Sequence, residues 1–265
     1  MTICAYCKQD RTATREHIVP AFLYEYQKTL DASIVGWNEA AGKMVPGEFK
    51  VKDVCDDCNS RTLSQLDDYA KALLKNVGIL TPNYTRSTLT LSYDYDLLVR
   101  WLLKVSFNSS RTDGAHRHLF EDLVPYMLGN EARPRRGRVT VAAYLAGAER
   151  IDSAKRAAVP YLKDVDTEQP FNPFLVRICY GAVERGRPYM LRLNVFGPLV
   201  FFMLLFDEGI LPGHASAEIR RFLKKFAGAV ELTAQHKRVE LRAGETTWAD
   251  LYAAQVARVK ALNLS

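Results

Sequence analysis

Cys4-Ala5-Tyr6-Cys7 near the start of the chain and Cys55-Asp56-Asp57-Cys58 further along it are two cysteine pairs with the same C-x2-C spacing. Two thiolates at this spacing can bind one side of a tetrahedral Zn²⁺, and two such turns complete a four-thiolate site. Disulfide bonds are the alternative interpretation, but they are rare in the reducing cytosol. The spacing therefore predicts a structural zinc site formed by all four cysteines.

Two polar motifs accompany the cysteine pairs. Glu16-His17-Ile18-Val19-Pro20 follows the first pair, and Asn59 comes directly after the second. Carboxylate and amide oxygens suit a hard cation such as Mg²⁺. An imidazole titrates near neutral pH, so it can take a proton from water. Such groups together are suited to metal-assisted hydrolysis of a phosphodiester bond, in which the cation stabilises negative charge.

The order of these motifs resembles that of the HNH endonuclease family, in the zinc-knuckle branch of the ββα-metal nucleases. The matching pattern lies within residues 1 to about 75. The resemblance implies that His17 is the general base and that Glu16 and Asn59 bind a catalytic Mg²⁺ or Mn²⁺. It assigns structural zinc to Cys4, Cys7, Cys55 and Cys58. It also implies that the strand with His17 packs against the helix that begins near Asn59.

Some features depart from the family pattern. The family more often has Asp before the catalytic His, and Lys50 stands where its middle Asn is expected. Asn38 and Asp53 are the candidates to orient His17 instead, although neither matches the motif. About 47 residues separate the cysteine pairs, which exceeds the usual gap and implies an inserted segment around residues 24–45.

Simpler interpretations of the same residues stay open. His17 could be a zinc ligand or an ordinary surface histidine, and Asn59 could only cap a helix. Asp67 shares one side of the expected helix with Asn59, where it either faces solvent or braces the site.

Apolar spacing predicts the elements of the rest of the chain. Helical periodicity favours helices over 63–77 and 94–107 and one from Ser216, and Thr247 with Asp250 three residues on is typical of the capped start of a last helix. Alternation favours strands over 139–145, 174–180 and 189–195, and 199–206 is typical of a strand buried on both faces.

These elements predict an α+β fold class in two parts. Thr81-Pro82-Asn83 is a break in the pattern, so we place a domain boundary near residue 80. Residues 1–80 are expected to form a ββα-metal HNH module with the four-cysteine zinc site. Residues 81–265 are expected to form a mixed α+β domain with a largely antiparallel sheet.

Charge is distributed unevenly between these two parts. The chain has a net charge of +6, but residues 1–80 carry 10 basic and 11 acidic side chains, so the excess lies beyond them. This asymmetry favours a polyanionic partner of the C-terminal part, although a basic surface can also serve solubility alone. The candidate phosphate contacts are four residues of one loop and four of one helix face: Arg133, Arg135, Arg136, Arg138, Arg220, Arg221, Lys224 and Lys225.

The function that these observations predict is a metal-dependent endonuclease that hydrolyses DNA, and the resemblance implies a role in restriction or anti-phage defence. The alternative is a zinc-knuckle protein that binds nucleic acid without catalysis. Glu16, His17 and Asn59 together favour the enzyme, because a binding knuckle needs none of them. The same chemistry suits RNA as well as DNA. A partner protein or an activating ligand is compatible with the C-terminal part.

We expect a cytoplasmic protein that does not enter a membrane. The start of the chain lacks the basic and apolar regions of a signal peptide. The longest nearly apolar run, 195–206, is shorter than the roughly 20 residues that span a bilayer.

Overall fold

A computed structural model gives the arrangement of most of the chain. It describes residues 2–30, 35–38, 43–113, 116–134, 137–152 and 169–252. Among the helices in these ranges, none combines the length and the apolar composition that crossing a membrane requires.

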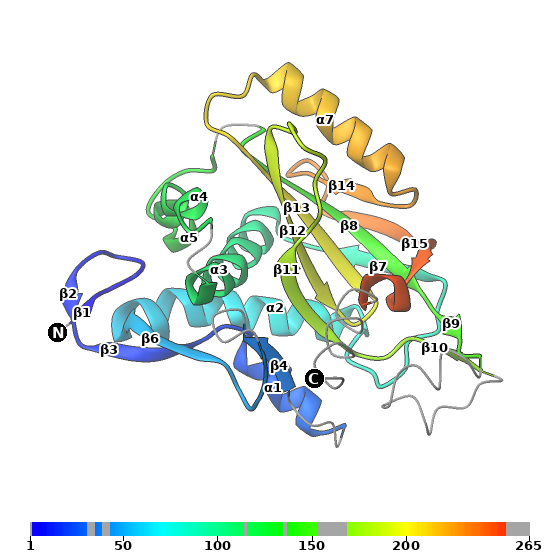
Figure 1. Cartoon of the computed structure of the whole chain (residues 1–265), viewed down its shortest axis with the longest axis horizontal. Coiled ribbons are helices and arrows are strands. Elements are labelled where there is room, and N and C mark those ends of the chain that lie inside the picture. The colour runs from blue at the N-terminus through cyan, green and yellow to red at the C-terminus, as the bar shows by residue number, and fades with distance from the viewer. Residues whose placement is uncertain are drawn as a thin grey trace.

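The N-terminal part consists of short strands around two helices (Figure 1). Strand β3 (Ala13–His17) pairs antiparallel with β6 (Lys50–Cys55), and a π-helical turn, η1 (Cys58–Leu63), leads from β6 into α2 (Ser64–Asn76). This part is completed by β1 (Thr2–Ile3), β2 (Asp10–Arg11), α1 (Ala21–Lys28), β4 (Val35–Asn38) and β5 (Lys43–Pro46). The α2 helix confirms the predicted amphipathic helix, and Gly78, which has a φ of 72°, follows its end.

A seven-stranded sheet forms the centre of the molecule. Its order is β11-β12-β13-β8-β15-β7, and β14 also pairs with β8. All of its pairs are antiparallel except that of β15 with β8. The prediction of a mixed α+β fold with a largely antiparallel sheet is therefore confirmed. The strands are β7 (Thr88–Ser92), β8 (Val139–Gly147), β11 (Val176–Tyr180), β12 (Tyr189–Phe196), β13 (Leu199–Phe206), β14 (Val230–Leu232) and β15 (Arg238–Thr247), and a separate pair is β9 (Glu149–Arg150) with β10 (Pro170–Phe171).

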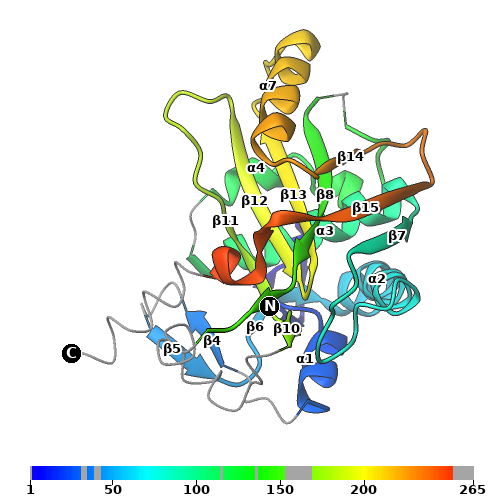
Figure 2. The same ribbon diagram turned by 90° about the vertical axis from the view of Figure 1, so that its right-hand side faces the viewer.

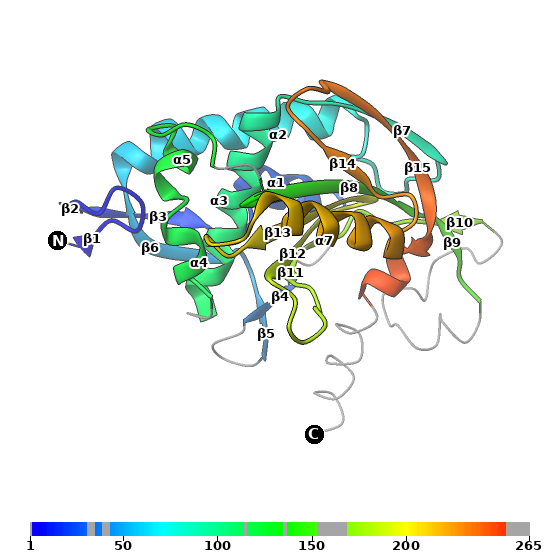
Figure 3. The same cartoon turned by 90° about the horizontal axis from the view of Figure 1, so that it is seen from above.

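Helices cover both faces of this sheet. Side chains of β13 alternate between two cores: Phe201 packs in the one that contains Trp101 of α3 (Tyr95–Asp113), and Phe202 in the one that contains Phe222 of α7 (Pro212–Lys225). Figures 2 and 3 show α7 running along the strands on its side. Every residue of β13 is buried, as predicted, because successive side chains of a strand point to opposite faces.

Two helices differ in extent from their predicted ranges. The α3 helix continues to Asp113, because its polar residues Asn108 and Arg111 are packed against the N-terminal part instead of facing water. The α7 helix begins at Pro212, and proline suits the first turn of a helix because it lacks only an N–H that has no partner there. Two short helices follow α3: α4 (His118–Glu121) and α5 (Val124–Leu128).

The two halves of the chain share one hydrophobic core. Cys4, Leu66 and Trp101 belong to the same cluster of buried residues as Phe201 of the sheet. Tyr6 meets Phe107 of α3 edge to face, with their ring centroids 5.2 Å apart. The domain boundary near residue 80 stays a prediction, and the side chains on its two sides are packed together.

Candidate metal centre and catalytic site

The four cysteines of the two C-x2-C pairs meet in space. Their sulfur atoms all lie within 4.8 Å of one another, and Cys7 Sγ is 3.7 Å from Cys55 Sγ. A tetrahedral Zn²⁺ with Zn–S bonds of about 2.3 Å separates its sulfurs by about 3.8 Å. Cys55 N–H also donates a hydrogen bond to Cys4 Sγ over 3.3 Å, which favours a thiolate there. This cluster could therefore bind a structural metal such as zinc.

Backbone hydrogen bonds form the turn that presents the first pair. Cys4 N–H donates to Gln9 O, and Lys8 N–H donates to Cys4 O, so the chain folds back between β1 and β2. Lys8 has a φ of 60°, the left-handed conformation that closes this turn. Ala5 N–H donates to Asp53 O of β6 and thereby fixes the first pair beside the second.

His17 ends strand β3 directly opposite Lys50 of β6. Its Nε2 atom lies 2.9 Å from Glu48 Oε2, and its side chain is 23% exposed. Glu48 also binds Lys28 Nζ at 2.7 Å and Lys50 Nζ at 3.0 Å. Hydrogen bonds from Lys28, His17 and Lys50 hold the pKa of Glu48 at about 2, so this carboxylate is ionised at neutral pH.

One of the two residues that the sequence offered to orient His17 has another partner in the structure. Asp53 forms an ion pair with Arg111 of α3 instead. The side chain of Asn38 lies outside the described part of the structure. Glu48 escaped the sequence analysis because it precedes β6 and belongs to no motif; its position two residues before Lys50 was the available signal.

Asn59 connects the helical segment to the strand of His17. Its Nδ2 atom donates to Thr14 Oγ1 at 2.9 Å and to Arg15 O at 3.3 Å. The strand and the following helical segment thus meet, as the sequence analysis predicts. Capping is not the role seen for Asn59, because η1 begins at Cys58 and the Asn59 amide donates to β3.

Glu16 points into the protein, where α3 provides its partners. Its Oε1 atom lies 2.8 Å from Lys104 Nζ and accepts a hydrogen bond of 2.8 Å from Asn108 Nδ2. Lys104 also binds Asp67 Oδ2 at 2.6 Å, and the Lys104 side chain is only 1% exposed. Burial alone lowers the pKa of Lys104, but the Asp67 and Glu16 carboxylates outweigh it and raise that pKa above its ordinary value.

Asn108 is the second residue of α3 that holds the site. Its Oδ1 atom accepts hydrogen bonds from Tyr6 OH and from Arg111, both at 2.6 Å. Its Nδ2 atom donates to Glu16 and, over 3.0 Å, to the backbone oxygen of His17. The sequence analysis missed Lys104 and Asn108, although Lys104, Asn108 and Arg111 form a polar stripe at helical spacing within an apolar helix.

Of the four arginines in the loop that was predicted to bind phosphate, two bind acidic side chains of the protein and two lie outside the described residues. Arg135 and Arg136 lie outside them. Arg133 binds Asp96 through two hydrogen bonds and lies over the Tyr95 ring. Its contact with DNA stays a prediction.

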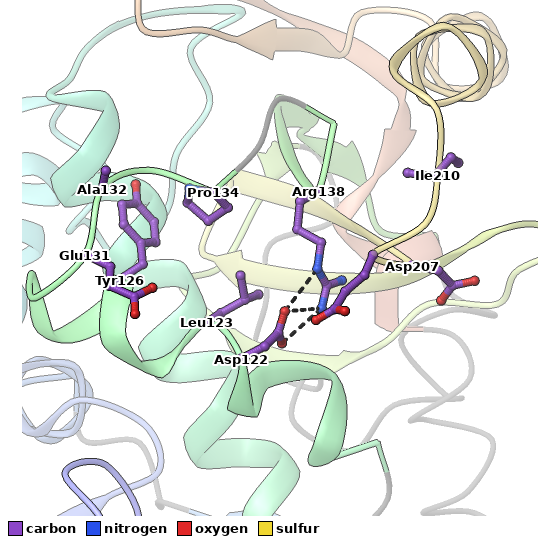
Figure 4. Close-up of a pocket in the computed structure, with 10 residues that line it drawn as sticks. Asp122, Leu123, Tyr126, Glu131, Ala132, Pro134, Arg138, Asp207 and Ile210 are labelled. Carbon is purple, nitrogen blue, oxygen red and sulfur yellow. Dashed lines mark hydrogen bonds and ion pairs between the residues drawn. The ribbon is translucent and has the colours of Figure 1, made fainter.

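Arg138 lies in a pocket of about 190 Å³ (Figure 4), where its guanidinium binds Asp122 at 2.8 Å. The Arg138 side chain is only 10% exposed. The other charged residues lining this pocket are acidic: Asp122, Glu131, Asp207 and Glu208. These carboxylates repel phosphate, so we leave Arg138 out of the DNA interface proposed below.

The four basic residues predicted to lie on the outer face of α7 are exposed: Arg220, Arg221, Lys224 and Lys225. Arg221 pairs with Glu218 at 3.1 Å, and Lys225 with Glu184 at 3.5 Å. Figures 1 and 2 place α7 at the opposite end of the molecule from α1, and Figure 1 places it far from β3, which carries His17.

The structure thus shows an α+β protein with a cluster of four cysteines that could bind a metal such as zinc, and His17 lies at the other end of the β3–β6 pair from Cys55. In comparisons with known proteins, no family model, no curated protein and no solved structure matched this chain.

Proposed function

We propose that this protein is a metal-dependent endonuclease of the HNH type that hydrolyses DNA, and that its four-cysteine cluster holds Zn²⁺. The observation that supports this most is the hydrogen bonding of Asn59 to Thr14 and Arg15. It brings the helical segment after the second cysteine pair against the strand that ends in His17. A protein that uses its zinc knuckles only to bind nucleic acid has no need of this arrangement.

In this proposal, His17 takes a proton from the water that attacks the phosphodiester bond. A bound Mg²⁺ or Mn²⁺ would stabilise the negative charge that develops on the phosphate. Glu16 and Asn59 are the proposed ligands of that cation, and Glu16, whose Oε1 atom accepts a hydrogen bond from Asn108, would have to turn its carboxylate outward to reach it. The Lys104 ammonium already neutralises part of the charge of Glu16, so we expect weak binding of the cation.

The central test is the His17→Ala variant. We expect cleavage of plasmid DNA to slow by about 10²–10⁴-fold, because that is the usual contribution of a general base. Zinc content, melting temperature and DNA affinity should remain close to those of the wild-type protein, because His17 is half-buried and is not one of the clustered cysteines. Nicking would be measured in Mg²⁺ and in Mn²⁺, with a single-stranded RNA as a second substrate.

His236→Ala is the matched control, because His236 is exposed between β14 and β15, which lie far from β3 in Figure 1. Equal cleavage rates for His17→Ala and His236→Ala would refute the catalytic role. DNA binding without cleavage by the wild-type protein would favour the non-catalytic alternative, and preference for the RNA substrate would replace DNA by RNA in the proposal.

The proposed interface with DNA includes the exposed basic face of α7. We expect the double variant Arg220→Ala/Arg221→Ala to bind all DNA sequences less tightly, since phosphate contacts carry no sequence information. Loss of two such contacts should make the plot of log K against log salt shallower by about 1.8. Fluorescence anisotropy at several salt concentrations measures this slope. Arg238→Ala/Arg242→Ala, which removes two exposed charges from β15, is the control. An unchanged slope in the α7 variant would exclude the helix from the interface.

A further inference from the structure

The residue that fixes the ring of His17 is not identified by the motif, because Lys50 stands in place of the expected Asn. We propose that Glu48 is the positioning residue of His17, and that it leaves Nδ1 as the ring atom that accepts the proton. This inference rests on the function proposed above, and it names the atoms through which His17 would act.

The hydrogen-bonding capacity of the two side chains determines which ring atom is available. Glu48 Oε2 lies 2.9 Å from His17 Nε2, and an ionised carboxylate can only accept hydrogen bonds. The hydrogen between these two atoms is therefore carried by Nε2. In the neutral imidazole, the other nitrogen then has a free lone pair. His17 is thus held in the tautomer whose Nδ1 can act as a base.

Two lysines keep the Glu48 carboxylate ionised and in place. Lys28 Nζ lies 2.7 Å from Oε1, and Lys50 Nζ lies 3.0 Å from Oε2. Lys28 comes from α1 and Lys50 from β6, so Glu48 is bound from two separate elements.

The backbone next to Glu48 is held in place by two hydrogen bonds of Phe49, the residue that follows it. Phe49 N–H donates to Tyr24 OH at 3.2 Å, and Phe49 O accepts from Ile18 N–H at 2.9 Å. The Tyr24 ring also lies near the imidazole, with the two ring centroids 6.0 Å apart. A backbone hydrogen bond therefore joins the residue after Glu48 to the residue after His17. This bond helps to fix the distance between the Glu48 and His17 side chains.

The test is nuclear magnetic resonance of the full-length protein with ¹⁵N-labelled histidine at pH 8, where imidazoles of ordinary pKa are neutral. Comparison with His17→Ala identifies the signals of His17. We expect the wild-type ring to carry its hydrogen on Nε2 and to show a low-field N–H proton protected from exchange. Glu48→Ala should lose this proton signal and become a mixture of tautomers. Glu48→Gln should keep the signal, because its amide oxygen can still accept the hydrogen bond.

Cleavage kinetics supply the second measurement. Loss of an orienting partner typically costs about 10–100-fold in activity. We therefore expect kcat of Glu48→Ala to fall by that factor, with KM little changed. The kcat of Glu48→Gln should lie between those of Glu48→Ala and the wild-type protein. Glu25→Ala, at a 68% exposed carboxylate of α1, is the control and should change neither measurement. Melting curves and zinc content verify that each variant is folded.

A wild-type ring protonated on Nδ1, or ring signals unchanged in Glu48→Ala, would overturn the inference even if His17 proves essential for cleavage. Conversely, the expected ring signals in a protein that cleaves no nucleic acid would support the Glu48–His17 assignment and refute the proposed function.

Discussion

Cys55→Ser is expected to abolish the proposed binding of Zn²⁺ and to remove on the order of 10 kcal/mol of folding free energy, because a structural four-thiolate zinc site contributes that much in small domains. Cys55 ends β6, and its Sγ lies 3.7 Å from that of Cys7, so the substitution breaks the connection between the two cysteine pairs. Elemental analysis for zinc and thermal melting followed by circular dichroism measure the two effects.

Cys179→Ser is the matched control, because Cys179 lies on β11 and is not one of the four clustered cysteines. It should keep its zinc and its melting temperature. The loss in Cys55→Ser should extend to the sheet, since Tyr6 between the first two cysteines packs on Phe107 of α3. A well-folded wild-type protein without bound metal would contradict the zinc assignment.

Lys104→Met is expected to lower the free energy of unfolding by about 3–5 kcal/mol, because removal of one partner of a buried ion pair leaves charge without compensation. The Lys104 side chain is only 1% exposed and holds both Glu16 and Asp67. Methionine keeps most of the side-chain volume, so the loss is electrostatic rather than a packing defect. Urea unfolding measures the change.

The triple variant Lys104→Met/Glu16→Gln/Asp67→Asn separates charge from packing. It leaves no ionised group of this network in the interior, so we expect it to recover part of the stability that Lys104→Met loses. Lys75→Met, at an exposed position of α2, is the control and should change stability by less than about 0.5 kcal/mol. A loss in Lys104→Met as small as that of the control would show that the ion pairs do not stabilise the fold.

Local patterns in the sequence predicted four strands of the central sheet and three helices, but not β7, β14 or β15. The apolar spacing of α2 predicts a helix and the unbroken apolar run of β13 predicts a buried strand, and both are found. The C-x2-C spacing likewise predicts the cluster of sulfurs, because the two cysteines of each pair are close in sequence and the chain only has to bring two turns together.

The residues of α3 that hold the candidate site in place could not be predicted from local patterns. Asn108 binds Glu16 across 92 positions of sequence, and Lys104 binds Asp67 across 37. Such contacts arise only once α3 has packed against β3 and α2, and nothing in the periodicity of a single helix reveals its partner. Glu48 is closer in sequence, 31 positions from His17, but its position opposite His17 depends on how β3 pairs with β6.

Asn108 also determines how far the candidate site can be separated from the rest of the molecule. A ββα segment is often regarded as a portable unit that could be grafted onto another carrier. Here the side chain that holds Glu16 and the His17 carbonyl is supplied by α3, beyond the predicted boundary near residue 80. A chimaera that transplants residues 1–80 alone would leave Glu16 without Lys104 and Asn108, so any functional graft has to carry α3 with it.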